Sequence, residues 1–190
     1  MPSLLITTSR RTSNRVRSFA RDLSSVFPES ERFNRGSMSV EELVSRIRQS
    51  GANAALVISI WKGNPGELTL LTGSGEEFLK IRLDSALLRR ETNPMFRKRI
   101  SGIGSACAKL GCSTKVLELS KDLASILDVP LRQAQSPEEL RDDTNKTVLW
   151  FDDAPSGKIL WTHYTSQDAD EIGPRMTIST IWRCLNHESK

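Results

Sequence analysis

An α/β pattern occurs twice along this chain of 190 residues, at a nearly constant offset. The stretch from residue 19 to residue 27 is matched by residues 119 to 127, with apolar residues at helical spacing and Asp-Leu near the centre of both. Pro28 follows the first stretch and Pro130 the second, and proline ends helices. A coincidence among common helix residues is the alternative, but the match predicts a tandem duplication of an α/β unit.

Both copies predict the same order of elements. In the first copy we expect strands and helices at Leu4–Thr7, Ser13–Phe27, Arg32–Arg35, Ser39–Ile47, Ala55–Trp61, Glu67–Leu71 and Phe78–Leu83. In the second copy, Ser136–Leu140 echoes the capping box at Ser39, and Val148–Tyr164 is a second hairpin. Its first strand, Gly104–Ala108, is weak strand material. We therefore expect one domain over residues 1–190, with halves 1–84 and 100–190 and a basic connecting segment at 85–99.

The cysteines and the apolar runs indicate a cellular setting. Cys107, Cys112 and Cys184 are odd in number, and the first two are too far apart for a zinc knuckle. No signal segment precedes the first strand, and no apolar run approaches the roughly 20 residues that cross a bilayer. These features predict a reduced, cytoplasmic protein without a membrane partner.

Charge is distributed unevenly, although the net charge is only +4. Residues 1–50 carry 9 basic and 5 acidic side chains, residues 80–121 carry 10 and 3, and residues 122–171 carry 4 and 11. Such a distribution suits an anionic partner on one surface. Arginine, with 18 residues against 9 lysines, favours bidentate contacts with phosphate.

The sequence offers no convergent set of catalytic residues. His163 and His187 are the two histidines, and a structural or surface role is expected for each. No Ser-His-Asp set, HExxH helix or P-loop occurs, and Asp152-Asp153 fits the start of a turn better than a metal site. We therefore expect no enzyme activity, no metal and no cofactor.

Basic residues form the candidate site. A strand runs into a helix start that holds Arg10, Arg11, Arg15 and Arg17, where acidic residues would suit the helix dipole. A polyanion would supply the missing negative charge, whereas the alternative is a solvated surface with local acidic partners. Phe96 and Trp61 are assigned to the core rather than to base stacking, so we expect contacts with the RNA backbone and shape to dominate over readout of single bases. The predicted RNA-binding residues are Arg10, Arg11, Arg15, Arg17, Arg21, Arg35, Arg97, Lys98, Arg99 and Arg175.

Several short motifs resemble those of Brix-domain proteins of ribosome biogenesis, in a compact archaeal form similar to the Imp-four group. The resemblance covers nearly the whole chain and is strongest in its first 85 residues. The motifs are Leu5-Ile6-Thr7-Thr8-Ser9-Arg10 with Ser13 and Arg15, then Phe19-Ala20, Val26-Phe27-Pro28, Phe33-Asn34-Arg35-Gly36 and Glu171-Ile172-Gly173-Pro174-Arg175.

This resemblance implies a two-lobed fold whose halves are both similar to the anticodon-binding domain of class II aminoacyl-tRNA synthetases. It also implies binding of ribosomal RNA precursors and of ribosome assembly proteins or ribosomal proteins, without catalysis. Two alternatives remain open: a protein scaffold that docks ribosomal proteins through its acidic second half, and a tRNA-binding accessory domain.

Overall fold

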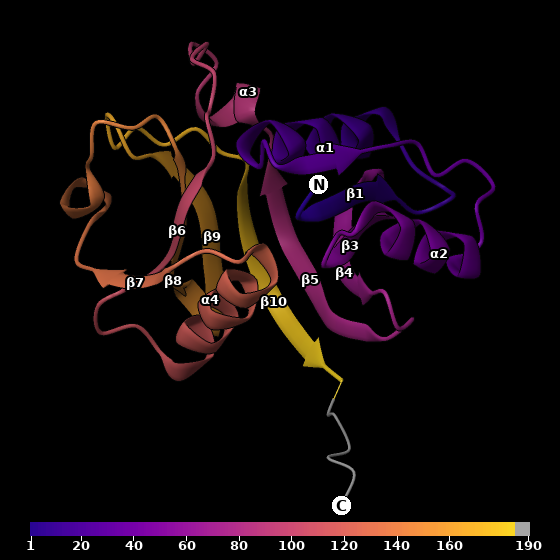
Figure 1. The fold of residues 1–190 in the computed structure, drawn as a ribbon. Coiled ribbons are helices and arrows are strands. Elements are labelled where there is room, and N and C mark those ends of the chain that lie inside the picture. Colours follow the sequence, from indigo (N-terminus) through magenta and orange to yellow (C-terminus); the bar gives the residue numbers. More distant parts are fainter. Residues whose placement is uncertain (185–190) are drawn as a thin grey trace, which may run out of the picture.

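Two long antiparallel strands, β5 (Glu77–Leu87) and β10 (Arg175–Arg183), lie at the centre of the computed structural model, which describes residues 1–184. They join two halves into one ten-stranded sheet of order β2-β1-β3-β4-β5-β10-β9-β8-β6-β7. Figure 1 shows the halves side by side, with the connecting segment crossing above them. The two halves repeat one strand order outward from the centre.

The remaining elements follow in chain order. The first half contains β1 (Leu4–Thr8), α1 (Asn14–Val26), β2 (Ser30–Arg32), α2 (Val40–Ser50), β3 (Ala54–Trp61) and β4 (Asn64–Thr72). The connecting segment contains the short helix α3 (Arg89–Thr92). The second half contains β6 (Ile103–Lys109), α4 (Thr114–Leu127), β7 (Leu131–Ala134), η1 (Pro137–Leu140), β8 (Thr147–Ala154), η2 (Pro155–Gly157) and β9 (Lys158–Thr165).

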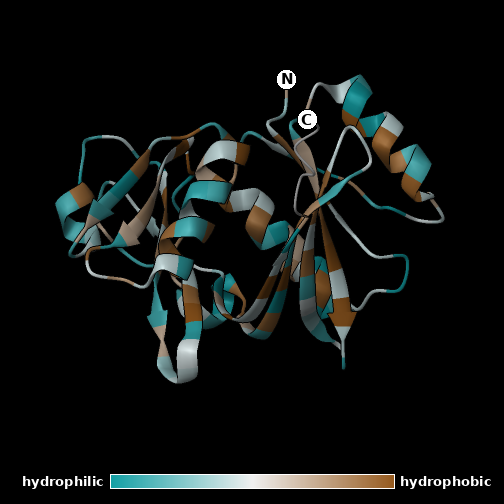
Figure 2. Ribbon diagram, turned by 90° about the horizontal axis from the view of Figure 1, so that it is seen from below, coloured by the Kyte–Doolittle hydropathy of each residue, from teal (hydrophilic) through white to brown (hydrophobic). Residues whose placement is uncertain are grey.

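Alternation along the strands divides the core between the two faces of the sheet. In β1, Leu4 and Ile6 pack into a large cluster with α1 and α4, whereas Leu5 packs with α2 on the opposite face. The cluster under α1 and α4 contains residues of both halves, so the halves share one core. Figure 2 shows polar and apolar residues mixed along the helices, as expected for helices that bury one side. We propose that residues 1–184 unfold as one unit.

The central strands leave one face of the sheet uncovered. Leu79 and Ile81 of β5 are buried in the core under α1 and α4, but Arg82 and Asp84 are exposed. On β10, Trp182 pairs with Lys80 and is 42% exposed. On this face α2 covers β1 and β3, and η1 covers β6 and β8. The uncovered part lies between them.

Two expected elements differ from the observed ones, and a third, the weak first strand of the second half, is confirmed. The second strand occupies Ser30–Arg32 rather than Arg32–Arg35. Ser136–Leu140 does not start an α-helix but forms the single turn η1, because Arg141 is already extended. Gly104–Ala108 does form a strand, as part of β6, despite its weak propensity; pairing on both sides, with β7 and β8, outweighs that propensity.

Trp61 corrects a prediction made from the sequence. Instead of lying in the core, its side chain is 67% exposed at the end of β3. Phe96 is half-buried and packs against the core, with the Arg89 guanidinium 5.2 Å from its ring centre. Within residues 1–184, no helix has the length and apolar character needed to cross a membrane.

Candidate nucleic-acid interface

A hollow of about 400 Å³ lies where β1 and β2 end. These neighbouring strands are parallel, and α1 follows β1 on one face of the sheet while α2 follows β2 on the other. Connections that leave adjacent strand ends for opposite faces open a crevice, which is where open α/β sheets bind ligands. The lining residues are Thr8, Ser9, Arg10, Thr12, Arg17, Arg21, Arg32, Asn34, Arg35 and Gly36.

Five arginines from four parts of the chain converge on this hollow, which we call the arginine pocket: Arg10, Arg17, Arg21, Arg32 and Arg35. Arg17 and Arg21 lie one turn apart on α1 and therefore on the same side of it. Arg32 ends β2, and Arg10 and Arg35 come from the two loops. The helix, the strand end and the loops thus contribute to one basic site.

The positive charge of the arginine pocket has no acidic counterpart in the described part of the chain. None of the five guanidinium groups makes an ion pair within residues 1–184, and no carboxylate lines the hollow. Burial, followed by repulsion from Arg10, lowers the pKa of Arg35 from its usual value, although Arg35 stays protonated at neutral pH. Guanidinium groups this close are stabilised by an anion that bridges them.

The first turn of α1 contributes backbone donors beside the same pocket. Ser13 caps the helix through a hydrogen bond from the Val16 N–H to its Oγ (3.2 Å). No acidic residue occupies this first turn. The hydroxyl of Thr12, which lines the pocket, is buried without a hydrogen-bond partner in the described structure. Helix N-termini of this kind attract phosphate.

The equivalent helix start in the second half is neutralised by the protein itself. The carboxylate of Asp153 accepts hydrogen bonds from the N–H (2.7 Å) and the hydroxyl (2.6 Å) of Ser113, just before α4. These bonds lower the pKa of Asp153. Lys109, at the end of β6, pairs with Asp152 at 3.1 Å. The two halves therefore share a topology but differ in charge at corresponding positions.

Other predicted site residues lie outside the arginine pocket. Arg11 is exposed in the same loop but does not line the hollow. Arg15 faces α3 and binds Glu91. Arg175 is the first residue of β10, and its guanidinium group forms an ion pair with Glu171.

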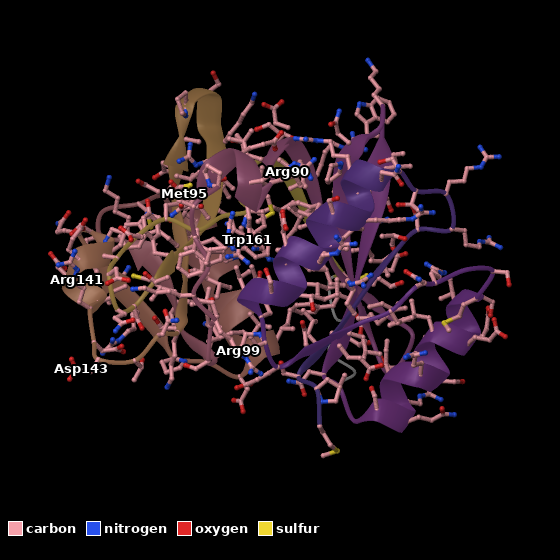
Figure 3. The ribbon with its side chains drawn as sticks, turned by 90° about the horizontal axis from the view of Figure 1, so that it is seen from above. Arg90, Met95, Arg99, Arg141, Asp143 and Trp161 are labelled. Carbon is pink, nitrogen blue, oxygen red and sulfur yellow. The ribbon has the colours of Figure 1, made fainter. Side chains whose placement is uncertain are left out.

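The connecting segment carries a second basic group. Arg97 donates to the carbonyls of Pro94 (2.6 Å) and Phe96 (3.0 Å), and Lys98 pairs with Asp168. Arg99 and Arg90 are exposed, and Figure 3 shows them on this segment near α1. These residues lie between the halves and not in the arginine pocket.

Sequence reasoning missed Arg32 as a site residue. Arg32 ends a strand parallel to β1, and the carboxyl ends of parallel neighbours meet at one edge. That rule could have added Arg32 to the site, had the strand been placed at residues 30–32. The strand was predicted at residues 32–35, which placed Arg32 at the amino end of the strand rather than at its carboxyl end.

The described part of the chain shows no arrangement suited to a metal. No group of three or more potential ligands comes together within residues 1–184. His163 is fully buried, and its Nδ1 lies 2.8 Å from the Pro174 carbonyl, to which it donates. Burial lowers the pKa of His163 to about 4. His187 lies outside the described residues.

The fold and the site define an α/β protein with a mixed ten-stranded sheet and a basic crevice at its strand ends. No family model matches the chain. A probable Brix domain-containing ribosomal biogenesis protein of Thermococcus kodakarensis is 30% identical over 189 residues, which cover 94% of this chain and 90% of that protein. The U3 small nucleolar ribonucleoprotein protein IMP4 of Bos taurus is 41% identical over 64 residues, or 34% of this chain and 22% of that protein.

The fold comparison agrees with these relatives. The crystal structure of a probable ribosomal biogenesis protein from Aeropyrum pernix K1 superposes with a TM-score of 0.77 at 23% identity, covering 95% of this chain and 97% of that one. At that identity the likeness concerns the fold alone. The Thermococcus kodakarensis relative, which matches over nearly the full length, shows the family: the chain belongs to the Brix domain-containing ribosomal biogenesis proteins.

Proposed function

We propose that this protein is a non-catalytic ribosome assembly factor that binds precursor ribosomal RNA through the arginine pocket. The observation that carries the proposal is the convergence of five guanidinium groups without a carboxylate among the described residues. RNA phosphates supply that negative charge, and arginine forks bind them bidentately. One relative, the IMP4 protein, is named as part of a ribonucleoprotein.

We propose that the exposed Arg11, Arg90 and Arg99 are further contacts, so that RNA held in the pocket continues across α1 towards the connecting segment, where Figure 3 shows Arg90 and Arg99. Lys98, Arg97 and Arg175 remain in the proposal as flanking contacts. They are secondary because Lys98 and Arg175 are paired with carboxylates and Arg97 does not line the arginine pocket. The proposed partners are cytoplasmic precursor rRNA and the proteins that assemble with it.

The proposal contains no chemical step. His163, the one histidine within residues 1–184, is sealed between aromatic rings and is neutral at physiological pH. A buried neutral imidazole without access to a ligand does not serve as an acid or a base. The pocket is polar and basic, and it is suited to holding phosphates rather than transforming them.

Direct binding measurements test the pocket. We expect a triple variant, Arg17→Ala, Arg21→Ala and Arg35→Ala, to weaken binding to precursor rRNA fragments. The slope of log affinity against log salt should fall by about 2 to 3, since every lost phosphate contact removes about 0.7–0.9. The matched control removes three exposed charges of the second half, Lys121, Arg132 and Arg141.

Crosslinking in the protein's own cells identifies the RNA. Sequenced fragments should cluster on precursor rRNA, and fewer should be recovered with the triple variant. Equal affinity and equal salt slope in the triple variant and the control would remove the arginine pocket from the interface. If tRNA fragments dominate, the tRNA-binding alternative would replace the proposal that the protein binds precursor rRNA.

A further inference from the structure

Trp61 is exposed in a way that the other tryptophans are not. Trp150 and Trp161 are buried, and the ring of Trp182 is partly covered by the Arg82 guanidinium, 5.1 Å from its centre. Trp61 has 67% of its surface exposed, and the Lys62 Nζ lies 5.7 Å from its ring centre. A single exposed aromatic is ordinary on a protein surface, so its surroundings decide its meaning.

The turn that carries Trp61 is hydrogen-bonded to the loop of the arginine pocket. The Ser13 hydroxyl donates to the Gly63 carbonyl at 2.7 Å, and the Ser9 N–H donates to the Ile58 carbonyl at 2.9 Å. Ser9 itself lines the arginine pocket. The end of β3 and the turn after Trp61 therefore lie beside the β1–α1 loop, although more than 40 residues separate the two in sequence.

Three neighbouring hollows, which we call the groove, lie between Trp61 and the arginine pocket. One hollow of about 400 Å³ on the uncovered sheet face is lined by Trp61 together with Ser59 and Glu67. A second, of about 230 Å³, shares Ser59 and Glu67 with it and shares Ser9 and Arg35 with the arginine pocket. The three hollows thus follow one another from the strand ends onto the open face.

The acidic residues of this groove are already paired. Glu67 lies 3.8 Å from Arg82, Glu77 lies 3.1 Å from Lys80, and Asp84 lies 2.8 Å from Lys158. The groove therefore presents an anionic ligand with neutralised carboxylates, while Lys62 and the arginine pocket remain positive. This charge complementarity favours a nucleic acid over an acidic or neutral peptide.

A glycine on the neighbouring strand leaves room for the Trp61 side chain. The pairing of β3 with β4 shifts register between Ser59 and Ile60, opposite Gly66. A Cβ at Gly66 would lie 2.3 Å from the Trp61 Cβ, closer than two such atoms can be. Glycine at this bulge thus leaves the space that the tryptophan occupies.

From this placement we infer that Trp61 is a stacking platform for an unpaired base of RNA whose backbone phosphate lies in the arginine pocket. The inference rests on the proposed function and adds the class of RNA, because only a base outside a duplex offers a free face to an indole ring. The bound segment is therefore single-stranded where it crosses the end of β3.

The test compares Trp61→Ala with wild type on two probes, a short oligoadenylate and a blunt RNA duplex of equal length. We expect binding of the oligoadenylate to weaken about tenfold and binding of the duplex to stay unchanged, since one base stack is worth about 1–3 kcal/mol. The salt slope should not change, because no charge is removed. Trp61→Phe should retain most of the affinity.

Trp182→Ala is the matched control, since it removes the other exposed tryptophan from the same sheet face and should leave both affinities unchanged. Equal loss on both probes, or no loss on either, would overturn the inference. So would a wild-type protein that self-associates through Trp61 while Trp61→Ala binds RNA normally. Failure of the proposed function looks different: the arginine-pocket triple variant would then bind both probes as wild type does.

Discussion

The guanidinium group of Arg15 forms two parallel hydrogen bonds with the carboxylate of Glu91, of 2.8 and 2.9 Å. Arg15 also donates to the Ala86 carbonyl at 3.0 Å, and Glu91 accepts from the Leu88 N–H at 2.7 Å. The pKa of Arg15 is raised and that of Glu91 lowered, mainly by the hydrogen bond between them. The ion pair links α1 to the connecting segment. Arg15 is thus paired with a carboxylate, whereas Arg17 on the same helix lines the arginine pocket.

Arg15→Ala and Arg17→Ala should accordingly separate stability from RNA binding. We expect Arg15→Ala to lower the free energy of unfolding by about 1 kcal/mol, since its pair is partly exposed, with a small effect on RNA affinity. Arg17→Ala should leave stability within about 0.5 kcal/mol and weaken RNA binding. Denaturant unfolding and RNA titrations of both variants give the comparison; equal effects on affinity would contradict it.

Arg175→Ala should make the stability of the protein respond differently to acid. Burial alone would raise the pKa of Glu171, but hydrogen bonds from Arg175 and Thr162 outweigh it and lower the pKa. Without Arg175, ionised Glu171 is half-buried and unpaired, so we expect a loss of about 1–2 kcal/mol at pH 7. The loss should shrink below about pH 4.5, where the carboxyl of the variant is protonated.

Unfolding curves at pH 7 and pH 4 measure this difference, with Arg132→Ala as an exposed control. If Arg175→Ala lowers the free energy of unfolding equally at pH 7 and pH 4, the carboxylate of Glu171 is not the cause. RNA affinity of Arg175→Ala should fall less than that of Arg17→Ala, because the Arg175 charge is already compensated.

His163 should make the protein less stable as the pH falls from 7 to 5. Its ring lies 5.4 Å from Phe27 and 5.6 Å from Trp161, and its pKa is lowered to about 4 from 6.5 by burial. The unfolded chain therefore binds a proton below about pH 6.5 that the folded chain does not bind until about pH 4. The free energy of unfolding should drop by about 2 kcal/mol between pH 7 and pH 5.

The comparison variant is His163→Gln, which cannot titrate. It is expected to be less stable at pH 7, since it disturbs a packed site, but its stability should change less between pH 7 and pH 5. If the free energy of unfolding changes equally with pH in wild type and variant, His163 is not the cause of the loss of stability.

The protein should unfold in a single cooperative transition. Helices α1 and α4 share one core, β5 pairs with β10, and the Asn53 amide donates to the Ile126 carbonyl at 2.8 Å across the halves. Calorimetric and van't Hoff enthalpies should therefore agree. Two resolved transitions would show instead that the two halves are separate folding units.

Local features of the sequence were enough to predict much of this fold. Ser13 and Ser39 cap helices because their side chains accept bonds from the first helical turns, an interaction between residues three apart. The alternation of Leu4, Leu5 and Ile6 places them on opposite faces of a strand by the geometry of the backbone. The repeated order of elements followed from the same local patterns, taken twice.

The sequence by itself determined the elements, their repeated order and a surplus of arginine at the first helix. Only the tertiary structure decided which arginines converge and which are paired: Arg15 meets Glu91 across 76 residues, whereas Arg17 and Arg32 meet at the arginine pocket. It also exposed Trp61, because the alternation along β3 that places Ile58 and Ile60 on the core face places Trp61 on the uncovered face of the sheet. Periodicity states which side of an element a residue occupies, but charge pairing and exposure depend on neighbours that are distant in sequence.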